Sequence, residues 1–219
     1  MISINVMPTG MLDVNCSLIG NLQTKEAFLV DPGGDEDEIY QYIKDQRLNL
    51  KAILHTHAHF DHIMGTEPLI KKYYRNQNIP VYLHNDDQFL WENLAFQAQV
   101  FNLNLPGNDL KVTHQLHHNE ILEICQIKIR VMNTPGHSPG SCSFLISEPF
   151  VSTPVLIVGD VIFQGSIGRT DLWKGDYNTL IKSIHENIFS CPDQTRIIPG
   201  HGPETTVGEE KMYNPYLAE

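Results

Sequence analysis

Four side chains that bind first-row metals fall within seven positions of this sequence, in the stretch Thr-His-Ala-His-Phe-Asp-His at 56–62. In an extended segment His57 and His59 point to the same side, so that one ion can bind both imidazoles. Asp61 and His62 follow where a chain that turns into a helix would present them to a second ion. Two ions about 3.5–4 Å apart are the usual means of activating water against an acyl or phosphoryl centre. The spacing therefore predicts a binuclear hydrolytic site rather than a histidine-rich surface loop.

Two ions need more ligands than this cluster offers, and three later residues can supply them. His137, Asp160 and His201 each lie in a loop marked by glycine or proline, in the stretches TPGHSPG, VGDVIFQG and PGHGP. Alone, each is an ordinary loop residue. Together with the first cluster they complete a set of five histidines and two aspartates.

Apolar runs precede several of these residues, which indicates how they are positioned. Asp31, His57, Asp160 and His201 follow the runs FLV, AIL, VLIVG and RIIPG, respectively. Loops at the carboxyl ends of strands are where sheet proteins collect their chemistry. If these strands are neighbours, four distant segments meet at one rim. For Asp31 two interpretations stay open, a hydrogen-bond partner of a metal-binding histidine or a plain Asp-Pro turn.

The remaining pattern predicts strands alternating with a few amphipathic helices. Strands are expected at 2–7, 15–20, 27–30, 52–54, 81–83, 127–131, 143–146 and 155–158. Helices are expected after a capping box formed by Asp35 and Glu38, from Thr66, from Asn85 through Phe96, and from Asp176. Residues 102–119 are the least organised stretch. With no internal repeat and no long linker, the chain is expected to form one domain over residues 1–219.

Composition excludes several classes of protein. The formal net charge is −11, with 15 Lys and Arg against 26 Asp and Glu, which argues against a nucleic-acid partner. The four cysteines have no C-x-x-C spacing and are expected to be reduced thiols. No stretch approaches the 18 apolar residues of a membrane span. A soluble cytoplasmic protein without a membrane partner is the expectation.

Several motifs together resemble a known family. THAHFDH, TPGHSPG, the Gly159-Asp160 pair and PGHG are similar to the metallo-β-lactamase superfamily. DPGG, GDVIFQGSIGRTD and GHGPETT resemble its glyoxalase II-like (hydroxyacylglutathione hydrolase-like) members, particularly the short single-domain bacterial type. The similarity runs from about Asn15 to Pro215, nearly the whole chain. It implies an α+β fold, the four-layer αββα sandwich of that superfamily.

The resemblance also implies a division of the ligands and the role of each. One metal would be held by His57, His59 and His137, the other by Asp61, His62 and His201, with Asp160 bridging them. Asp61 would also position the attacking water. The carboxylate at 160 separates this chain from the true β-lactamases of the superfamily, which carry no bridging Asp there. The cofactors expected are two divalent metal ions; zinc is favoured, while iron and manganese accept the same ligands.

The substrate implied is a small-molecule thioester, S-lactoylglutathione above others, hydrolysed to D-lactate and glutathione by a monomer or homodimer. Arg169 matches the place where longer relatives put a basic residue for the glycine carboxylate of glutathione. A surface ion pair with Asp171 explains Arg169 equally well. Longer glyoxalase II enzymes add a C-terminal helical region that helps to hold glutathione, and this chain is too short for it.

Four rival functions are weighed against the thioesterase. A persulfide dioxygenase would use one iron at His57, His137 and Asp160, and would not need Asp61 or His62 as ligands. An acyl-homoserine lactone lactonase is a third enzyme of the same superfamily. A nuclease is weaker, because the chain lacks a basic surface. A non-enzymatic metal-binding scaffold would show a broken ligand set, and here all seven positions are filled.

Overall fold

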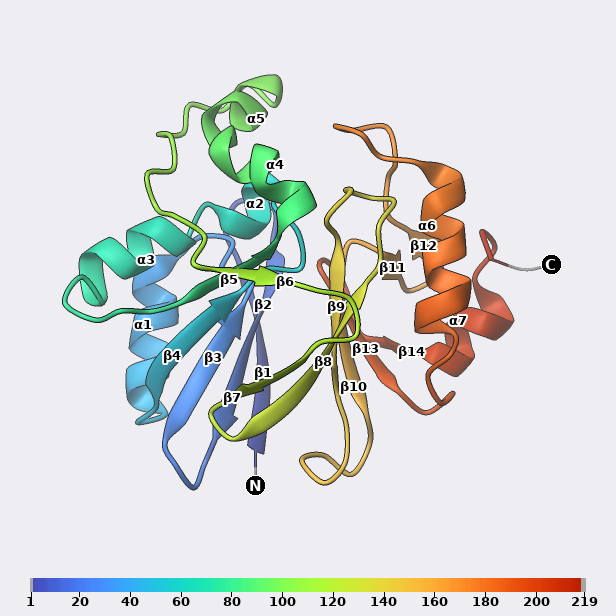
Figure 1. Ribbon diagram of the computed structural model, residues 1–219, viewed down its shortest axis with the longest axis horizontal. Coiled ribbons are helices and arrows are strands. Elements are labelled where there is room, and N and C mark those ends of the chain that lie inside the picture. Colours follow the sequence, from blue (N-terminus) through green and yellow to red (C-terminus); the bar gives the residue numbers. More distant parts are fainter. Residues whose placement is uncertain (1, 218–219) are drawn as a thin grey trace.

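The computed structural model describes residues 2–217 and contains two six-stranded sheets that face each other, with helices on both outer sides (Figure 1). In spatial order the first sheet contains β1 (Ile2–Thr9), β2 (Val14–Asn21), β3 (Glu26–Val30), β4 (Asn49–Leu54), β5 (Val81–His84) and β6 (His114–Leu116). The second contains β14 (Thr205–Thr206), β13 (Arg196–Pro199), β10 (Val155–Gly159), β9 (Cys142–Ile146), β8 (Ile127–Asn133) and β7 (Ile121–Ile124). A short ribbon pairs β11 (Ile162–Phe163) with β12 (Ser166–Ile167).

The helices divide between the two outer faces and the upper end of the sandwich in Figure 1. The first sheet is covered by α1 (Glu36–Asp45) and α3 (Thr66–Tyr73), and the second by α6 (Tyr177–Ser183), its π-helical continuation η2 (Ile184–Ile188) and α7 (Val207–Tyr213). At the end lie α2 (Phe60–Ile63), the 3₁₀ turn η1 (Asn85–Asp87), α4 (Gln88–Glu92) and α5 (Leu94–Val100). None of the helices within residues 2–217 has the length and apolar content that a membrane span requires.

Alternation along the strands produces three separate hydrophobic cores. Leu18 and Leu29 pack under α1 and α3, whereas Ile19 and Phe28, their chain neighbours, pack between the two sheets. In the second sheet Ile197 faces α6 and α7 in the third core. Successive strand residues point to opposite faces, so sheets buried on both sides need apolar residues at every position. Three cores separate four layers, which confirms the predicted αββα sandwich.

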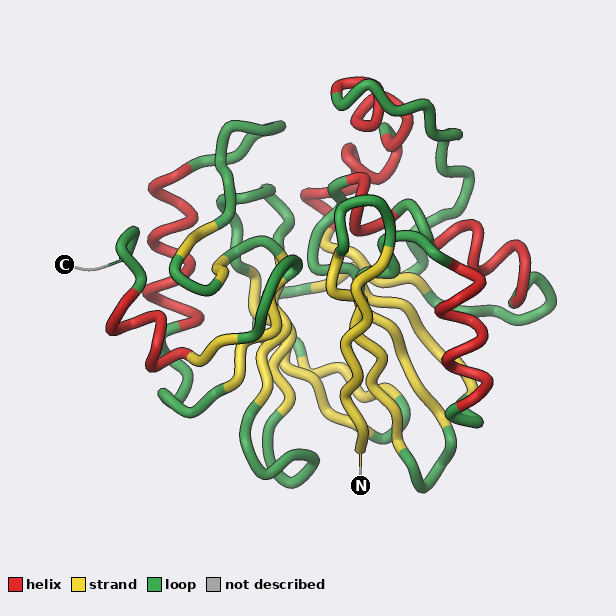
Figure 2. The backbone as a smooth tube through the Cα atoms, turned by 180° about the vertical axis from the view of Figure 1, so that it is seen from behind, coloured by secondary structure: helices red, strands yellow, loops and turns green. Residues whose placement is uncertain are grey.

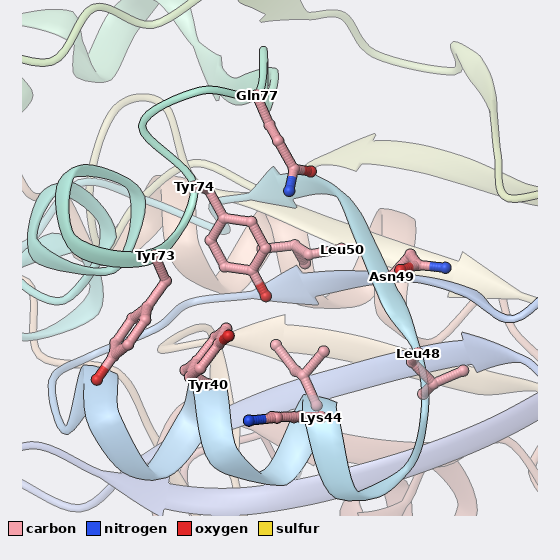
Figure 3. A pocket seen from close by; sticks show the side chains of 9 residues that line it. Tyr40, Lys44, Leu48, Asn49, Leu50, Tyr73, Tyr74 and Gln77 are labelled. Atoms are coloured by element: carbon pink, nitrogen blue, oxygen red, sulfur yellow. The ribbon is translucent and has the colours of Figure 1, made fainter.

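Tyrosines fill part of the contact between α1 and α3. The rings of Tyr40 and Tyr73 are stacked with centroids 3.8 Å apart, and Tyr74 meets Tyr40 edge-on at 6.0 Å. A cavity of about 210 Å³ lies beside them (Figure 3). Tyr74 is 6% exposed, so its ring belongs to the packing of the two helices.

Most predicted elements are confirmed, with three differences. The capping box is wrong: Asp35 has φ 52° and makes no side-chain cap, and its carboxylate accepts a hydrogen bond from the Gly10 amide instead. The helix expected through Phe96 breaks at Asn93 into α4 and α5. Residues 102–119 include β6, which pairs parallel to β5 at the sheet edge. A three-residue edge strand carries too little hydrophobic alternation to be found from sequence.

The strands that precede the candidate site residues form two parallel pairs. β3 pairs with β4 in the first sheet, and β10 pairs with β13 in the second. Because the partners run in the same direction, their carboxyl ends emerge at the same edge of each sheet. Figure 2 shows the loops of both sheets gathered at that end of the sandwich. The expected rim therefore exists, but it spans two facing sheets rather than one.

Candidate metal centre

The histidine-rich segment leaves the end of β4 as an extended loop and turns into α2. His59 has φ −67° and ψ 148° and precedes the first residue of the helix. His57 and His59 therefore lie on the extended part, and Asp61 and His62 lie in the first helical turn, as the spacing predicted. All four side chains are buried, and His62 is completely inaccessible. Buried imidazoles and carboxylates need polar or metal partners.

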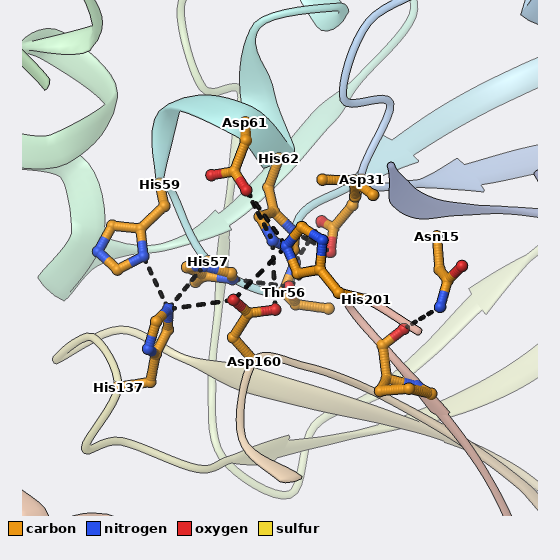
Figure 4. A network of polar contacts seen from close by, with 12 residues as sticks. Asn15, Asp31, Thr56, His57, His59, Asp61, His62, His137, Asp160 and His201 are labelled. Atoms are coloured by element: carbon orange, nitrogen blue, oxygen red, sulfur yellow. Dashed lines mark hydrogen bonds and ion pairs between the residues drawn. The ribbon is translucent and has the colours of Figure 1, made fainter. Parts of the chain in front are cut away.

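His137 joins two histidines of this segment in a first group. His137 Nε2 lies 2.7 Å from His59 Nδ1 and 3.2 Å from His57 Nε2 (Figure 4). Nitrogens of a tetrahedral zinc site are roughly 3.3 Å apart, since each lies about 2.0–2.1 Å from the ion. The three ring nitrogens thus converge on one point, as ligands of one ion would.

A second group contains Asp61, His62 and His201. Asp61 Oδ2 lies 3.2 Å from His201 Nε2 and 3.8 Å from His62 Nε2. His201 lies in the loop after β13 of the second sheet. Asp61 and His62 lie in α2, which follows β4 of the first sheet. The contact therefore depends on the packing of one sheet against the other.

Asp160 lies between the two groups. Its Oδ1 is 3.3 Å from His62 Nε2, and its Oδ2 is 3.6 Å from His137 Nε2 and 3.7 Å from His201 Nε2. Gly200 makes room for this carboxylate, because a Cβ at position 200 would lie 2.0 Å from Asp160 Oδ1. The glycine before His201 in PGHG is thus a steric requirement of the site.

Outer hydrogen bonds fix which nitrogen of each ring faces inward. Nδ1 contacts an oxygen outside the cluster in His137 (Arg169 carbonyl, 2.7 Å), His201 (Leu12 carbonyl, 2.9 Å) and His62 (Asp31 Oδ2, 3.0 Å). A carbonyl oxygen can only accept, so His137 and His201 carry their proton on Nδ1. Their Nε2 lone pairs then point into the site, which is the state that binds a metal.

Unsatisfied buried atoms indicate that the donor set fits a cation. His59 Nε2, His62 Nε2 and Asp160 Oδ1 are buried and have no hydrogen-bond partner within residues 2–217. Groups of this kind are costly to bury alone. The inward-facing His62 and Asp160 atoms lie where the two ligand groups meet. Nitrogen and carboxylate ligands of mixed type suit divalent zinc, iron or manganese.

Electrostatics differ between the two groups of histidines. Burial opposes protonation of His62 and His201, but the carboxylates of Asp160 and Asp61 raise the pKa of both above the ordinary value. Burial lowers the pKa of His57 and His59 well below the ordinary value, and the neighbouring histidines lower the pKa of both further. Both rings are therefore neutral and can bind a metal at neutral pH. Burial alone would raise the pKa of Asp160, but the charges of His62, His137 and His201 lower it. The carboxylate is thus ionised.

Asp31 takes the first of its two possible roles. Its Oδ1 accepts from the Thr56 amide at 2.8 Å, and its Oδ2 accepts from the Thr56 hydroxyl at 2.6 Å and from His62. Burial would raise the pKa of Asp31, but hydrogen bonds and charge from His55 and His62 lower it to about 2. A buried carboxylate that orients a histidine is a typical outer partner in metal sites. Asp31 also has a φ of 52°, directly before Pro32.

A cavity of about 160 Å³ opens onto the cluster and has an apolar wall. The apolar lining residues are Leu12, Phe60, Phe101, Leu172 and Trp173, and the polar ones are His59, Asp61, His137, Asp160, Arg169 and His201. The Trp173 ring lies 5.4 Å from the His59 ring. A substrate here would meet aromatic side chains as well as the cluster.

Arg169 lines this cavity but is also engaged outside it. Its Nε and Nη2 donate to Asp171 Oδ1 at 2.7 Å and Oδ2 at 2.8 Å. The Arg169 side chain is 52% exposed, so the pair is solvated. The surface ion pair weighed in the sequence therefore exists, and about half of the Arg169 side chain is exposed.

Sequence reasoning missed three polar residues that hold the site loops. Asn15 Nδ2 donates to the carbonyls of Pro199 and Gly202 at 3.0 and 2.8 Å, on either side of His201. The signal was an amide side chain in a strand whose eight residues are all buried. Asp87 and Gln97 hold the loops of the first group through hydrogen bonds to Ala58.

Comparison with known proteins identifies the class. A family model described as the metallo-β-lactamase superfamily matches residues 9–201. Hydroxyacylglutathione hydrolase GloC of Haemophilus influenzae (strain ATCC 51907 / DSM 11121 / KW20 / Rd) is 38% identical in an alignment of 218 positions that covers 98% of this chain and 98% of its own. The chain belongs to the metallo-β-lactamase superfamily and is a metal-dependent hydrolase.

Two solved structures are similar over almost the whole chain. BLEG-1, a B3 metallo-β-lactamase, superposes with a TM-score of 0.88 at 37% identity and covers 100% of both chains. TTHA1623, solved in a di-iron-bound form, superposes with a TM-score of 0.84 at 34% identity and covers 97% of this chain and 100% of its own. Both agree with the four-layer architecture.

Proposed function

We propose that this protein is a binuclear thioester hydrolase of the glyoxalase II type, acting on S-lactoylglutathione to give D-lactate and glutathione. The observation that carries the proposal is the convergence of six His and Asp side chains around Asp160. The similarity to hydroxyacylglutathione hydrolase GloC over 98% of both chains supports the choice of a thioester. We further propose that residues 1–219 form one hydrolase domain.

The proposed ligands follow the two groups. His57, His59 and His137 would hold one ion, Asp61, His62 and His201 would hold the other, and Asp160 would bridge them. Divalent ions held there supply Lewis acidity and lower the pKa of a water molecule toward about 7. Zinc is the metal proposed. Iron is the first alternative, since the similar TTHA1623 is described as di-iron-bound.

Asp61 has a second proposed role, which is to orient the attacking water. It lines the cavity and is 7% exposed, so a carboxylate oxygen can accept a hydrogen bond from water there. Attack on the thioester carbonyl releases a thiolate whose ordinary pKa is about 8.5, so it leaves without a protein acid. The apolar wall around Trp173 limits the water that reaches the ester.

Arg169 is proposed to contact a carboxylate of the substrate. Among the described residues that line the cavity, it is the one lysine or arginine. A substrate carboxylate would compete with Asp171 for the guanidinium. Arg169 would thus contribute to the choice of glutathione as thiol carrier, and the apolar wall to the choice of acyl group.

A β-lactam is the second candidate substrate, because BLEG-1 shares the fold at 37% identity. The position of Asp160 between the two groups argues for the thioesterase. The test is to purify the enzyme, count the ions per chain by elemental analysis, and measure hydrolysis of S-lactoylglutathione and of a β-lactam.

We expect two ions per chain and thioester hydrolysis at least tenfold faster, as kcat/KM, than β-lactam hydrolysis. Saturation at one iron per chain, with oxygen consumed on a persulfide, would replace the proposal with a persulfide dioxygenase. Faster opening of a β-lactam or an acyl-homoserine lactone would replace it with that activity.

A further inference from the structure

A buried carboxylate outside the ligand set connects the two loops that carry the first group. Asp87 ends η1, directly after β5, and its side chain is completely inaccessible. Its Oδ2 accepts from the Ala58 amide at 3.0 Å and from the Ser138 hydroxyl at 2.7 Å. Its Oδ1 accepts from the Gly140 amide at 2.7 Å. One side chain therefore contacts residues from two loops that are 80 positions apart in the chain.

The contacted residues are immediate neighbours of proposed ligands. Ala58 lies between His57 and His59, and Ser138 follows His137. The spacing of these two loops decides whether the ring nitrogens of His59 and His137 come within reach of one ion. One backbone hydrogen bond, from the Cys142 amide to the Thr56 carbonyl at 2.7 Å, joins the two segments at their bases. Asp87 joins them a second time, directly beside the histidines, through the Ala58 amide and the Ser138 hydroxyl.

The backbone at Gly140 packs tightly against Asp87. A Cβ at Gly140 would lie 2.7 Å from Asp87 Cγ and 2.7 Å from its backbone nitrogen. Position 140 therefore requires glycine, because the backbone at this position lies too close to Asp87 to leave room for a side chain. A contact this close holds the loop of His137 at a fixed distance from η1.

A second buried side chain holds the other half of the His59 loop. Gln97 of α5 donates from Nε2 to the Ala58 carbonyl at 3.0 Å, and its Oε1 accepts from the Phe60 amide at 3.2 Å. Gln97 is 1% exposed. Asp87 and Gln97 together satisfy the backbone groups on both sides of His59. The segment from η1 to α5 thus acts as a support for the first group.

We propose that Asp87 is a positioning residue that sets the distance between the loop of His57 and His59 and the loop of His137. The inference rests on the ligand division proposed above. It predicts a selective effect. Loss of Asp87 lowers the affinity of the first group for its ion and leaves the metal affinity of the group of Asp61, His62 and His201 unchanged. Substitution of a residue that only stabilises the fold would lower the metal affinity of both groups alike.

Asp87→Asn is the sharpest perturbation, because it keeps the volume and removes the charge. The Ala58 and Gly140 amides donate to opposite oxygens, and an asparagine has only one oxygen. Its amide nitrogen must then face one of these donors. Removal of an outer partner of this kind typically lowers metal affinity by about 10- to 100-fold.

The experiment measures Zn²⁺ affinity by competition with a chromophoric chelator in two backgrounds. His201→Ala disables the second group and reports on the first, and His57→Ala does the reverse. Asp87→Asn should weaken binding by about 10- to 100-fold in the His201→Ala background. In the His57→Ala background it should leave the affinity within about twofold.

Glu210→Gln is the matched control. Glu210 is 2% exposed and accepts from the Gly165 amide, the Thr205 hydroxyl and the Asn214 amide group at 3.0, 2.6 and 2.8 Å, outside the two ligand loops. It should leave both affinities unchanged. If Asp87→Asn fails to fold, Ser138→Ala is the alternative, because it removes one donor and keeps the carboxylate. It should lower the Zn²⁺ affinity of the first group selectively, by a smaller factor.

Two results would overturn the inference: equal weakening in both backgrounds, or unchanged affinity in the His201→Ala background. Failure of the unsubstituted protein to bind two ions is a different result. It would refute the proposed ligand division itself.

Discussion

Arg169 allows a direct test of the proposed thiol carrier. A glutathione thioester brings two carboxylates to a protein of net charge −11, so a fixed cation near the cavity must hold it. Arg169→Ala removes the one lysine or arginine that lines the cavity in the described part of the chain. We expect slower turnover of S-lactoylglutathione and no change for a small neutral thioester.

The magnitude follows from the two contacts that compete for the guanidinium. A charge-assisted contact contributes about 1.5–3 kcal/mol. The solvated pair with Asp171 must be weakened first, at a cost of about 0.2–1 kcal/mol. The difference of about 0.5–2.8 kcal/mol corresponds to a loss of roughly 2- to 110-fold in kcat/KM. Asp171→Asn should act in the opposite direction, because it frees Arg169 and removes a negative charge beside it.

The assay compares kcat/KM for the charged and neutral thioesters at low and high salt, because screening should reduce only the Arg169 effect. Arg196→Ala is the matched control, since Arg196 forms a similar half-exposed pair with Glu204 away from the cavity. Equal losses of kcat/KM on both thioesters would mean that Arg169 supports the structure of its loop instead of contacting the substrate. No loss on either would refute the glutathione carrier.

Three further outcomes are expected. Asp160→Ala should lose at least one ion and most activity while circular dichroism shows an intact fold, because the carboxylate contacts both ligand groups; unchanged turnover would move the site elsewhere. Trp173→Ala should lower kcat/KM more for thioesters with an apolar acyl group than for the acetyl thioester, because Trp173 lines the cavity; equal effects would contradict an acyl-binding role. Burial raises the pKa of Tyr74 to about 12, and the folded protein then keeps the Tyr74 proton longer than the unfolded chain does. As pH rises from 10 to 12, the wild type should therefore lose up to about 2 kcal/mol of unfolding free energy relative to Tyr74→Phe, measured by urea denaturation. The same pH dependence of the unfolding free energy in both proteins would refute this.

The sequence alone determined the local part of this protein. His57, His59, Asp61 and His62 are spaced so that an extended loop followed by a helical turn presents all four, and the structure has that conformation. Two strands buried on both faces, β3 and β10, were visible as continuous apolar runs. Such features depend on neighbours in the chain, and the periodicity of side chains along strands and helices is fixed by backbone geometry.

Only the tertiary structure decided which loops meet and what holds them. It favoured a hydrogen-bonding role for Asp31 by placing His62 3.0 Å away, and it engaged Arg169 with Asp171. Asp87 had no signal in the sequence, because its partners lie 29, 51 and 53 positions away. A buried carboxylate is recognisable only when the amide groups that it accepts from are known. These contacts arise from the packing of two sheets and their loops, which no local pattern encodes.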